Sequence, residues 1–278
     1  MSEAAQRREQ LKAVWEQARG CPRCPQLVET RRTVVFGAGN ADADLLFVGE
    51  APGANEDRLG LPFVGQAGAL LERLLGEIGL QRQDVFIANV LKCRPPGNRD
   101  PLPQEIDNCQ EYLFAQLELI RPKLVCTLGN FATKLLRSDP STGITRLHGR
   151  EEERVIGPLA VRLYPLLHPA AALYTPSMLT SLRADFERIP ELLARPRLPQ
   201  PAPIEAAPAV PEPELARVVA DPEPEEVLGA GVDEHGAGAL TRLEPSPSPL
   251  PDVSADAADE PGEPAAGAAE PPAQLGLF

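Results

Sequence analysis

The stretch Asp44–Gly53, DLLFVGEAPG, decides the fold, because it joins a short apolar run to a turn-forming loop. Its first part, Asp44–Gly49, is almost continuously apolar, which is typical of a strand that is buried on both faces of a parallel sheet. The run ends at Glu50, and the proline and glycine that follow predict a loop. Three further apolar runs of similar length occur at residues 85–90, 124–128 and 161–167.

Segments with helical periodicity separate these four predicted strands. The clearest lies at residues 66–78, where Ala67, Leu70, Leu71, Leu74, Leu75 and Ile78 fall on one face. Other helices are predicted at about residues 4–19, 104–120 and 177–194, and one more opens at residues 129–130. Strands that alternate with helices indicate an α/β fold of three layers, α/β/α, around a central, mainly parallel four-stranded sheet.

The composition changes sharply near Arg197. Residues 197–278 contain half of the 32 prolines, and they carry 16 acidic residues against three arginines and no lysine. The net charge of −13 therefore belongs to this stretch, whereas residues 1–196 are neutral overall. Such a composition buries too little apolar surface to offset chain entropy. We expect a folded domain at residues 1–196 and a disordered acidic tail at residues 197–278, so the acidic charge does not argue against DNA binding by the domain.

The sequence also bears on the compartment of the protein. No apolar run approaches the roughly 20 residues of a membrane-spanning helix, and the polar N-terminal segment lacks the apolar core of a secretory signal. We expect a monomeric cytoplasmic protein, associated with the nucleoid, that makes no contact with membranes.

Four of the five cysteines have the arrangement of a metal site. Cys21 and Cys24 form a C-x-x-C pair, Cys93 directly follows a predicted strand, and Cys109 lies on the inward face of a predicted helix. Four thiolates suit either zinc or an iron–sulfur cluster, and the spacing does not separate the two. The alternative is that they are ordinary core cysteines, as we expect for Cys126 inside an apolar strand.

The loop after the first strand gathers polar and aromatic side chains. Glu50, Glu56 and Phe63 lie within 14 residues of one another, among glycines that permit tight turns. In parallel sheets, ligands bind beyond the carboxyl ends of the strands. The loops that follow Gly49, residue 90 and residue 167 all start there, so this edge is the predicted functional site.

Three blocks of sequence and the cysteines resemble one family. The blocks are GEAPGANEDRLGLPFVGQAGALL at residues 49–71, NVLKCRPPGNRDP at residues 89–101 and LLHPAAAL at residues 166–173. Together they resemble the family 4 (iron–sulfur) uracil-DNA glycosylases over about residues 10–193. The resemblance implies an enzyme of base excision repair that flips deoxyuridine out of DNA and hydrolyses its N-glycosidic bond, leaving an abasic site. It also implies a 4Fe-4S cluster on the four cysteines, with zinc as the alternative.

The resemblance implies a role for several residues. Phe63 matches the aromatic residue that stacks on uracil, and Asn89 matches the amide that reads its edge. His168 matches the group that stabilises charge on the departing base, and Ala51 occupies a substrate-side position where relatives carry Gly or Ala. Glu50 and Glu56 match acidic positions, and we expect Glu56 to serve the attacking water and Glu50 to organise the loop.

Three positions are expected to contribute little to the chemistry. Asp57 is expected to be exposed and without a role, and His148 to lie in a surface loop. Tyr174 stands where Arg is frequent in the family, which weakens a phosphate contact there. No histidine occurs in residues 94–108, which disfavours the covalent capture of uracil used by a related branch.

Basic residues near the predicted edge are candidates for phosphate contacts, since such contacts supply much of the affinity for DNA. The candidates are Lys92, Arg94, Arg99, Arg146, Arg150 and Arg183.

The chain ends in Gln274, Leu275, Gly276, Leu277 and Phe278. This pentapeptide resembles the one by which bacterial repair proteins bind the DNA sliding clamp, and a chance apolar terminus is the alternative. Two other readings of the whole chain stay open: a cluster-containing nucleic-acid-binding module without hydrolysis, and a homologue that acts on another deaminated base.

Overall fold

The computed structural model describes residues 2–201. The predicted tail, apart from its first five residues, and the pentapeptide Gln274–Phe278 therefore lie outside the described residues. Within residues 2–201, no helix combines the length and the apolar character that crossing a membrane requires.

The centre of the domain is a six-stranded sheet with the strand order β1-β3-β2-β4-β6-β5. The strands are β1 (Ala38–Gly39), β2 (Leu45–Gly49), β3 (Phe86–Asn89), β4 (Leu124–Leu128), β5 (Glu152–Ile156) and β6 (Leu159–Leu166). β2 pairs in parallel with β3 and β4, and β4 pairs in parallel with β6. These are the four strands expected from the sequence, in the expected parallel arrangement.

Two antiparallel edge strands were not expected. β1 is only two residues long and pairs with β3, and β5 pairs with β6 across a tight turn at Gly157. β5 begins Glu152-Glu153-Arg154 and alternates between exposed and less exposed side chains. Charged residues are typical of edge strands, where they hinder pairing with other chains. A search for apolar runs therefore overlooks such a strand.

Helices cover the sheet on both faces. They are α1 (Glu3–Arg19), α2 (Pro25–Thr30), α3 (Ala54–Leu59), α4 (Gln66–Glu77), α5 (Pro103–Ile120), α6 (Asn130–Arg137), α7 (Ile144–Leu147), α8 (Pro169–Ala172), α9 (Pro176–Glu187) and α10 (Ile189–Ala194), with 3-10 turns η1 (Arg82–Asp84) and η2 (Pro96–Asn98). The final helix, expected as one element, is divided into α9 and α10 at Arg188, two residues before Pro190. Proline cannot supply the amide that a continuous helix needs.

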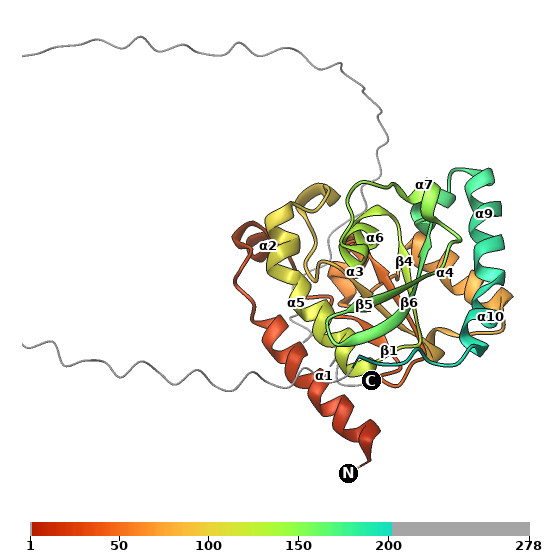
Figure 1. The fold of residues 1–278 in the computed structure, drawn as a ribbon. Helices are drawn as coiled ribbons and strands as arrows, with labels where there is room; N and C mark the ends of the chain where they lie inside the picture. Colours follow the sequence, from red (N-terminus) through yellow and green to blue (C-terminus); the bar gives the residue numbers. More distant parts are fainter. Residues whose placement is uncertain (1, 202–278) are drawn as a thin grey trace, which may run out of the picture. The chain divides into compact units, whose positions relative to one another are not determined.

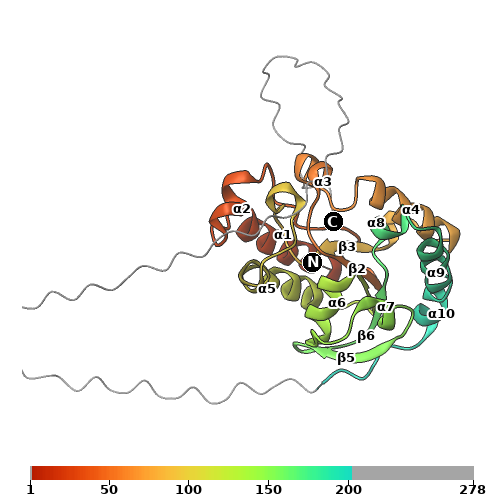
Figure 2. The same ribbon diagram turned by 90° about the horizontal axis from the view of Figure 1, so that it is seen from above.

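The two faces of the sheet have separate cores. Leu46 and Val48 of β2 pack with residues of α1, α5 and α6, whereas Leu45 and Phe47 pack with residues of α4, α9 and α10. Figures 1 and 2 show these two groups of helices on opposite sides of the sheet. Because successive side chains of a strand point to opposite faces, a fully apolar strand requires this arrangement. The predicted three-layer α/β/α architecture is confirmed.

Candidate active site

The carboxyl ends of the parallel strands carry a pocket of about 170 Å³. Its lining residues are Ala51, Gly53, Glu56, Phe63, Ala67, Asn89 and His168. Five of the six pocket residues proposed from the sequence are thus brought together from the ends of β2, β3 and β6, and Glu50 is the exception. Gly53 and Ala67 had not been singled out. Their small size leaves room in the pocket, but nothing else in the sequence marks them.

Asn89 carries an unsatisfied polar atom inside this pocket. It is the last residue of β3, it is 2% exposed, and its Oδ1 has no hydrogen-bond partner among residues 2–201. Leaving a buried acceptor without a partner costs about 1–3 kcal/mol. Such atoms are rare in native proteins and call for a functional explanation. The amide is therefore poised for a partner from outside the chain.

Gly49 gives Asn89 and Phe63 the space to approach each other. Gly49 is the partner of Asn89 in the β2–β3 register. A Cβ added at Gly49 would lie 2.7 Å from the ring of Phe63 and even closer to Asn89 Oδ1. The strand end can therefore bring the ring and the amide together only because residue 49 has no side chain.

Phe63 and His168 form the aromatic part of the pocket. Their ring centroids lie 5.8 Å apart, and the ring planes are inclined at 31°. Phe63 is only 6% exposed, yet its ring lines the cavity. A flat ligand ring can therefore stack on Phe63 while its edge faces Asn89.

His168 is held as a neutral hydrogen-bond donor. It is the N-cap of α8, and its Nδ1 accepts a hydrogen bond from the amide of Ala170 at 3.1 Å. Burial lowers the pKa of His168 to about 4, so the ring is uncharged at neutral pH. Because Nδ1 acts as an acceptor, the ring proton belongs on Nε2.

The two glutamates of the first motif have different surroundings. Glu56 Oε1 accepts hydrogen bonds from the amides of Val64 and Gly65, both at 2.9 Å, and Oε2 accepts one from Gly53 at 3.1 Å. The side chain of Glu50 makes no hydrogen bond to residues 2–201. Burial, assisted by the nearby charge of Asp100, raises the pKa of Glu50 to about 7. Asp100 was not foreseen, since its sequence distance from Glu50 gives no sign of this proximity.

Comparisons with known proteins agree with this geometry. Residues 36–193 match a family model described as the uracil DNA glycosylase superfamily. The chain is 44% identical over 190 residues to a type-4 uracil-DNA glycosylase of Archaeoglobus fulgidus, covering 67% of this chain and 95% of the relative. It is 43% identical over 191 residues to a type-4 uracil-DNA glycosylase of Sulfurisphaera tokodaii, covering 67% and 86%.

The chain belongs to the uracil DNA glycosylase superfamily. Within the superfamily it is more similar to the type-4 proteins than to a type-5 uracil-DNA glycosylase of Pyrobaculum aerophilum. That protein is 32% identical over 206 residues, covering 63% of this chain and 87% of the relative. The family expected from the sequence motifs is thus confirmed.

Asp57 lies in the first motif of this superfamily member. It was expected to be exposed, but it is buried. Its side chain is 2% exposed, and its carboxylate accepts hydrogen bonds from the amides of Arg32 at 2.9 Å and Thr33 at 3.2 Å. The hydroxyl of Thr33 also donates to the Asp57 carbonyl. Asp57 therefore ties α3, beside the pocket, to the segment that follows α2.

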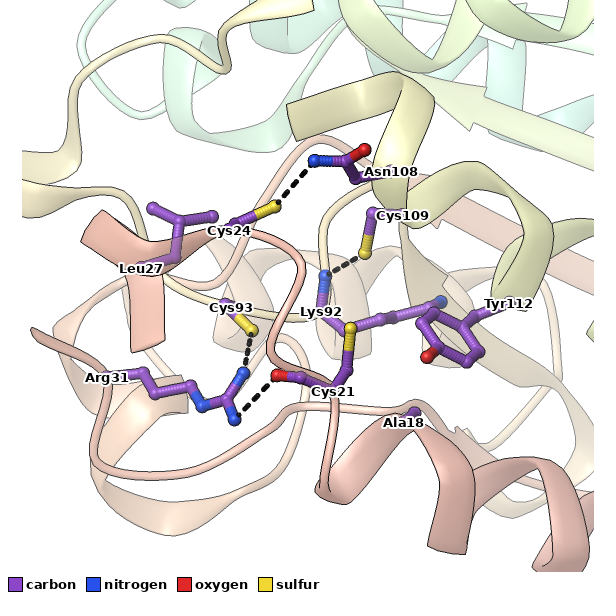
Figure 3. A pocket seen from close by; sticks show the side chains of 10 residues that line it. All are labelled: Ala18, Cys21, Cys24, Leu27, Arg31, Lys92, Cys93, Asn108, Cys109 and Tyr112. Atoms are coloured by element: carbon purple, nitrogen blue, oxygen red, sulfur yellow. Dashed lines mark hydrogen bonds between the residues drawn. The ribbon is translucent and has the colours of Figure 1, made fainter. Parts of the chain in front are cut away.

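The four cysteines line one cavity of this glycosylase-superfamily domain (Figure 3). Three of their sulfur atoms accept hydrogen bonds: Cys93 Sγ from Arg31 at 3.1 Å, Cys109 Sγ from the Lys92 amide at 3.3 Å, and Cys24 Sγ from Asn108 at 3.5 Å. Burial raises the pKa of Cys109 to about 11. Cys126 is in β4, away from this cavity, and is buried as expected.

The cysteines do not form a single-ion site. No set of three or more His, Cys, Asp or Glu side chains among residues 2–201 is arranged to hold one metal ion. The four cysteines nevertheless line the same cavity.

Lys92 is not available to DNA, so its prediction as a phosphate contact is wrong. It is 1% exposed, and its Nζ donates to Gln116 Oε1 at 2.7 Å and to the Asn89 carbonyl at 2.9 Å. Burial lowers the pKa of Lys92 to about 8, while the nearby thiols of Cys109 and Cys93 favour its charged form. The lysine links the cysteine cavity to the strand that carries Asn89.

The predicted arginine contacts fall into two groups. Arg99 pairs with Glu105 at 2.6 Å, and Arg183 pairs with Glu77 at 2.7 Å, which joins α9 to α4. Arg94 donates to Asn98 within its own loop. Arg146 and Arg150, near α7, are exposed. Because the other three arginines bind partners within the domain, Arg146 and Arg150 are the better candidates for DNA contacts.

His148 has a structural partner. Its Nδ1 lies 2.7 Å from Asp185 Oδ2, which connects the loop after α7 to α9. It lies partly exposed in the loop after α7, as expected, but with a partner that the sequence did not indicate.

Proposed function

We propose that the chain is a uracil-DNA glycosylase that takes deoxyuridine out of DNA and hydrolyses its N-glycosidic bond, leaving an abasic site. The observation that carries this proposal is the unpartnered, buried Oδ1 of Asn89 beside the ring of Phe63. The pocket lies below the surface of the domain, so a base must leave the duplex stack to reach it.

The amide of Asn89 has the hydrogen-bonding pattern that uracil needs. Its oxygen accepts from uracil N3–H, and its NH₂ group donates to uracil O4. Cytosine has an acceptor at N3 and a donor at C4, so it leaves both amide atoms unpaired. A site that holds buried polar groups rejects such a ligand strongly.

His168 is placed to stabilise the leaving base. Its neutral ring offers Nε2–H as a donor to uracil O2, where negative charge develops as the glycosidic bond breaks. A preorganised donor aimed at developing charge lowers the barrier without reorganisation during the reaction. The hydrogen bond from the Ala170 amide to Nδ1 keeps the donor on the correct nitrogen.

The surroundings of the two glutamates favour the opposite division of roles from the one expected from the sequence. Glu56 organises the loop, since its two oxygens accept three backbone amides. Glu50 has a carboxylate without such bonds and a pKa raised, by burial and by Asp100, to about 7, which suits a group that accepts a proton at neutral pH. We assign to Glu50 the orientation and activation of the attacking water.

The direct test is release of uracil from a labelled oligonucleotide by the purified full-length protein. We expect release from deoxyuridine and none from the matched deoxycytidine or thymidine oligonucleotides. Binding of the oligonucleotide without release would support the nucleic-acid-binding module instead. Release of a different deaminated base, with uracil untouched, would support the altered-base homologue.

The four-cysteine cavity fits a 4Fe-4S cluster held by Cys21, Cys24, Cys93 and Cys109. The four cysteines line one cavity, and four thiolates can hold either a 4Fe-4S cluster or zinc; the resemblance to the family 4 glycosylases favours the cluster. Metal-bound sulfurs accept hydrogen bonds from N–H groups, as three of these sulfurs do. Arg31 and Lys92 supply positive charge against thiolates. The cluster would hold in place the segment that carries Arg32 and Thr33, the hydrogen-bond partners of Asp57, and the strand that carries Asn89. Hydrolysis of a glycosidic bond transfers no electrons, so the cluster needs no redox role in it.

The chain supplies its own control for this assignment. Replacing Cys109 by Ala should abolish the brown colour and lower the iron content, because one of four ligands is lost. Cys126→Ala, in a buried strand outside the cavity, should keep both. Visible absorbance and iron analysis of the two variants check this. Equal colour in both variants would contradict the ligand set, and zinc without iron in the wild type would contradict the cluster.

We further propose that the acidic stretch 197–278, which lies outside the described residues from residue 202 on, connects the domain to a peptide whose residues Gln274, Leu275, Leu277 and Phe278 bind the DNA sliding clamp. Two leucines and a phenylalanine supply apolar anchors, and a tether would raise the local concentration of the enzyme near replicating DNA. Residues 197–278 are strongly acidic, whereas residues 1–196 are neutral overall, and this difference in charge supports a domain boundary near residue 196.

Pull-down on immobilised clamp tests the pentapeptide. Changing Leu277 and Phe278 to Ala should remove clamp binding, while changing Leu228 and Leu240 to Ala, elsewhere in the tail, should leave it unchanged. Binding that survives the first pair of changes would end the proposal.

A further inference from the structure

Phe63 has a backbone conformation that residues with side chains rarely adopt. Its φ is +52°, in the left-handed region, where a side chain meets the neighbouring backbone. Such conformations persist only where the surroundings hold them, and they gather at functional sites. The turn Pro62–Gly65 around Phe63 must therefore be fixed by other groups.

The amides of this turn are held from one side by a carboxylate. Glu56 accepts hydrogen bonds from Val64 and Gly65, the two residues that follow Phe63. The first turn of α4 also packs directly under the chain. At Gly68, an added Cβ would overlap the carbonyl group of Phe63.

The carbonyls of the same turn are held from the other side by a cation. Arg82, at the start of η1, donates from Nη1 to the Phe63 carbonyl at 2.8 Å and from Nη2 to the Pro62 carbonyl. A guanidinium presents several donors in a rigid, planar fork, so it can hold two successive carbonyls at once. Arg82 does not line the pocket, and it is 19 residues from Phe63 along the chain.

We propose that Arg82 is a positioning residue for base recognition: it fixes the left-handed turn that presents the ring of Phe63 to the extruded base. This inference rests on the proposed function, because it concerns how the same pocket holds uracil. The carboxylate of Glu56 and the guanidinium of Arg82 clamp opposite sides of one turn. The loss of Arg82 frees both carbonyls and lets the turn relax toward ordinary backbone angles, which moves the ring.

The chain offers a matched control for Arg82. The same guanidinium forms an ion pair with Glu72 of α4, with Nη1 and Oε1 3.1 Å apart. Glu72→Gln removes this ion pair but keeps both contacts from Arg82 to the turn. Arg82→Met removes the contacts to the carbonyls as well. Arg82→Lys keeps a positive charge near Glu72 but cannot hold two carbonyls with a planar fork.

We expect Arg82→Met to lower the single-turnover rate of uracil release by about 10- to 100-fold, as a small misplacement of a positioning group can. Glu72→Gln should react at the wild-type rate, and Arg82→Lys should fall between them. A second readout is binding to two oligonucleotides, one with 2′-fluorodeoxyuridine, whose glycosidic bond resists hydrolysis, and one with a tetrahydrofuran abasic analogue. Arg82→Met should lose the preference for the first, since only a base contacts Phe63, and bind the second normally.

The outcomes separate this inference from the function on which it rests. A wild type that releases no uracil overturns the proposed function itself. An active wild type with an equally active Arg82→Met overturns the positioning role alone. Equal losses in Arg82→Met and Glu72→Gln also overturn it, because they assign the effect to the ion pair. If Arg82→Met fails to fold, Arg82→Lys decides: an unchanged preference for the 2′-fluorodeoxyuridine oligonucleotide contradicts the inference.

Discussion

Asn89→Asp is expected to lower the single-turnover rate of uracil release by about 10³-fold, the upper range for loss of one preorganised catalytic hydrogen-bond group. The change keeps the size of the side chain and replaces the NH₂ donor by a second acceptor. That acceptor then faces uracil O4, so an attraction becomes a repulsion. Asn89 Oδ1 has no hydrogen-bond partner among residues 2–201, and aspartate keeps an oxygen in its place, so no internal hydrogen bond of this atom is lost.

Asn40→Asp is the matched control, because it makes the same chemical change outside the pocket. The side chain of Asn40 accepts a hydrogen bond from the amide of Asp42 at 2.9 Å, a role that a carboxylate fills equally well. We therefore expect the wild-type rate and melting temperature from Asn40→Asp, and a folded Asn89→Asp variant with a somewhat lower melting temperature, because a buried carboxyl group is costly. An Asn89→Asp variant that releases uracil at the wild-type rate would contradict the assignment of the amide to the edge of the base.

The second large effect is expected at Glu50. Glu50→Gln should lower the rate by at least about 10²-fold, the smaller value typical of a general base. The wild-type rate should rise with pH and reach half of its maximum near pH 7, because burial and Asp100 raise the pKa of Glu50 to about 7 and only the ionised carboxylate accepts a proton. Below that pH the carboxyl group is protonated, so the rate falls.

Asp100→Asn checks the cause of this pH dependence. It removes the neighbouring negative charge, which should lower the pKa of Glu50 and move the midpoint of the rate profile to lower pH, with little change in the maximum rate. Burial remains, so the midpoint should stay above the ordinary range of a glutamate. Single-turnover rates measured from about pH 5 to pH 9, in steps of roughly half a pH unit near the pKa of the glutamate, would show the shift of the midpoint. A profile that is flat for the wild type and for Asp100→Asn would remove Glu50 from the water-side role.

The sequence predicted the parts of the molecule that depend on local pattern. The run Leu45–Gly49 is apolar at every position because both faces of the sheet are covered, and that pattern is visible without a structure. The same pattern placed Asn89 and His168 at strand ends, so their convergence followed from the parallel arrangement. The edge strand β5 escaped notice because it has only one neighbour and keeps charged side chains.

What sequence could not provide was the pairing of distant polar groups. Asp57 and Lys92 are charged, and charged residues usually lie at the surface. Asp57 is buried because backbone amides of a distant segment donate to it, and Lys92 is buried because it donates to the distant Gln116 side chain and to the nearby Asn89 carbonyl. Arg82 and Asp100 likewise act on Phe63 and Glu50 through contacts that no local pattern encodes.

Gly49 sets a limit on how this pocket can evolve. All other encoded amino acids carry a Cβ, and at this position that atom would overlap the Asn89 amide and the Phe63 ring. Any missense mutation in the codon for residue 49 is therefore expected to displace the amide of Asn89 or the ring of Phe63. A change of base preference by exchange of the side chains at positions 63 and 89 is then expected to keep glycine at position 49.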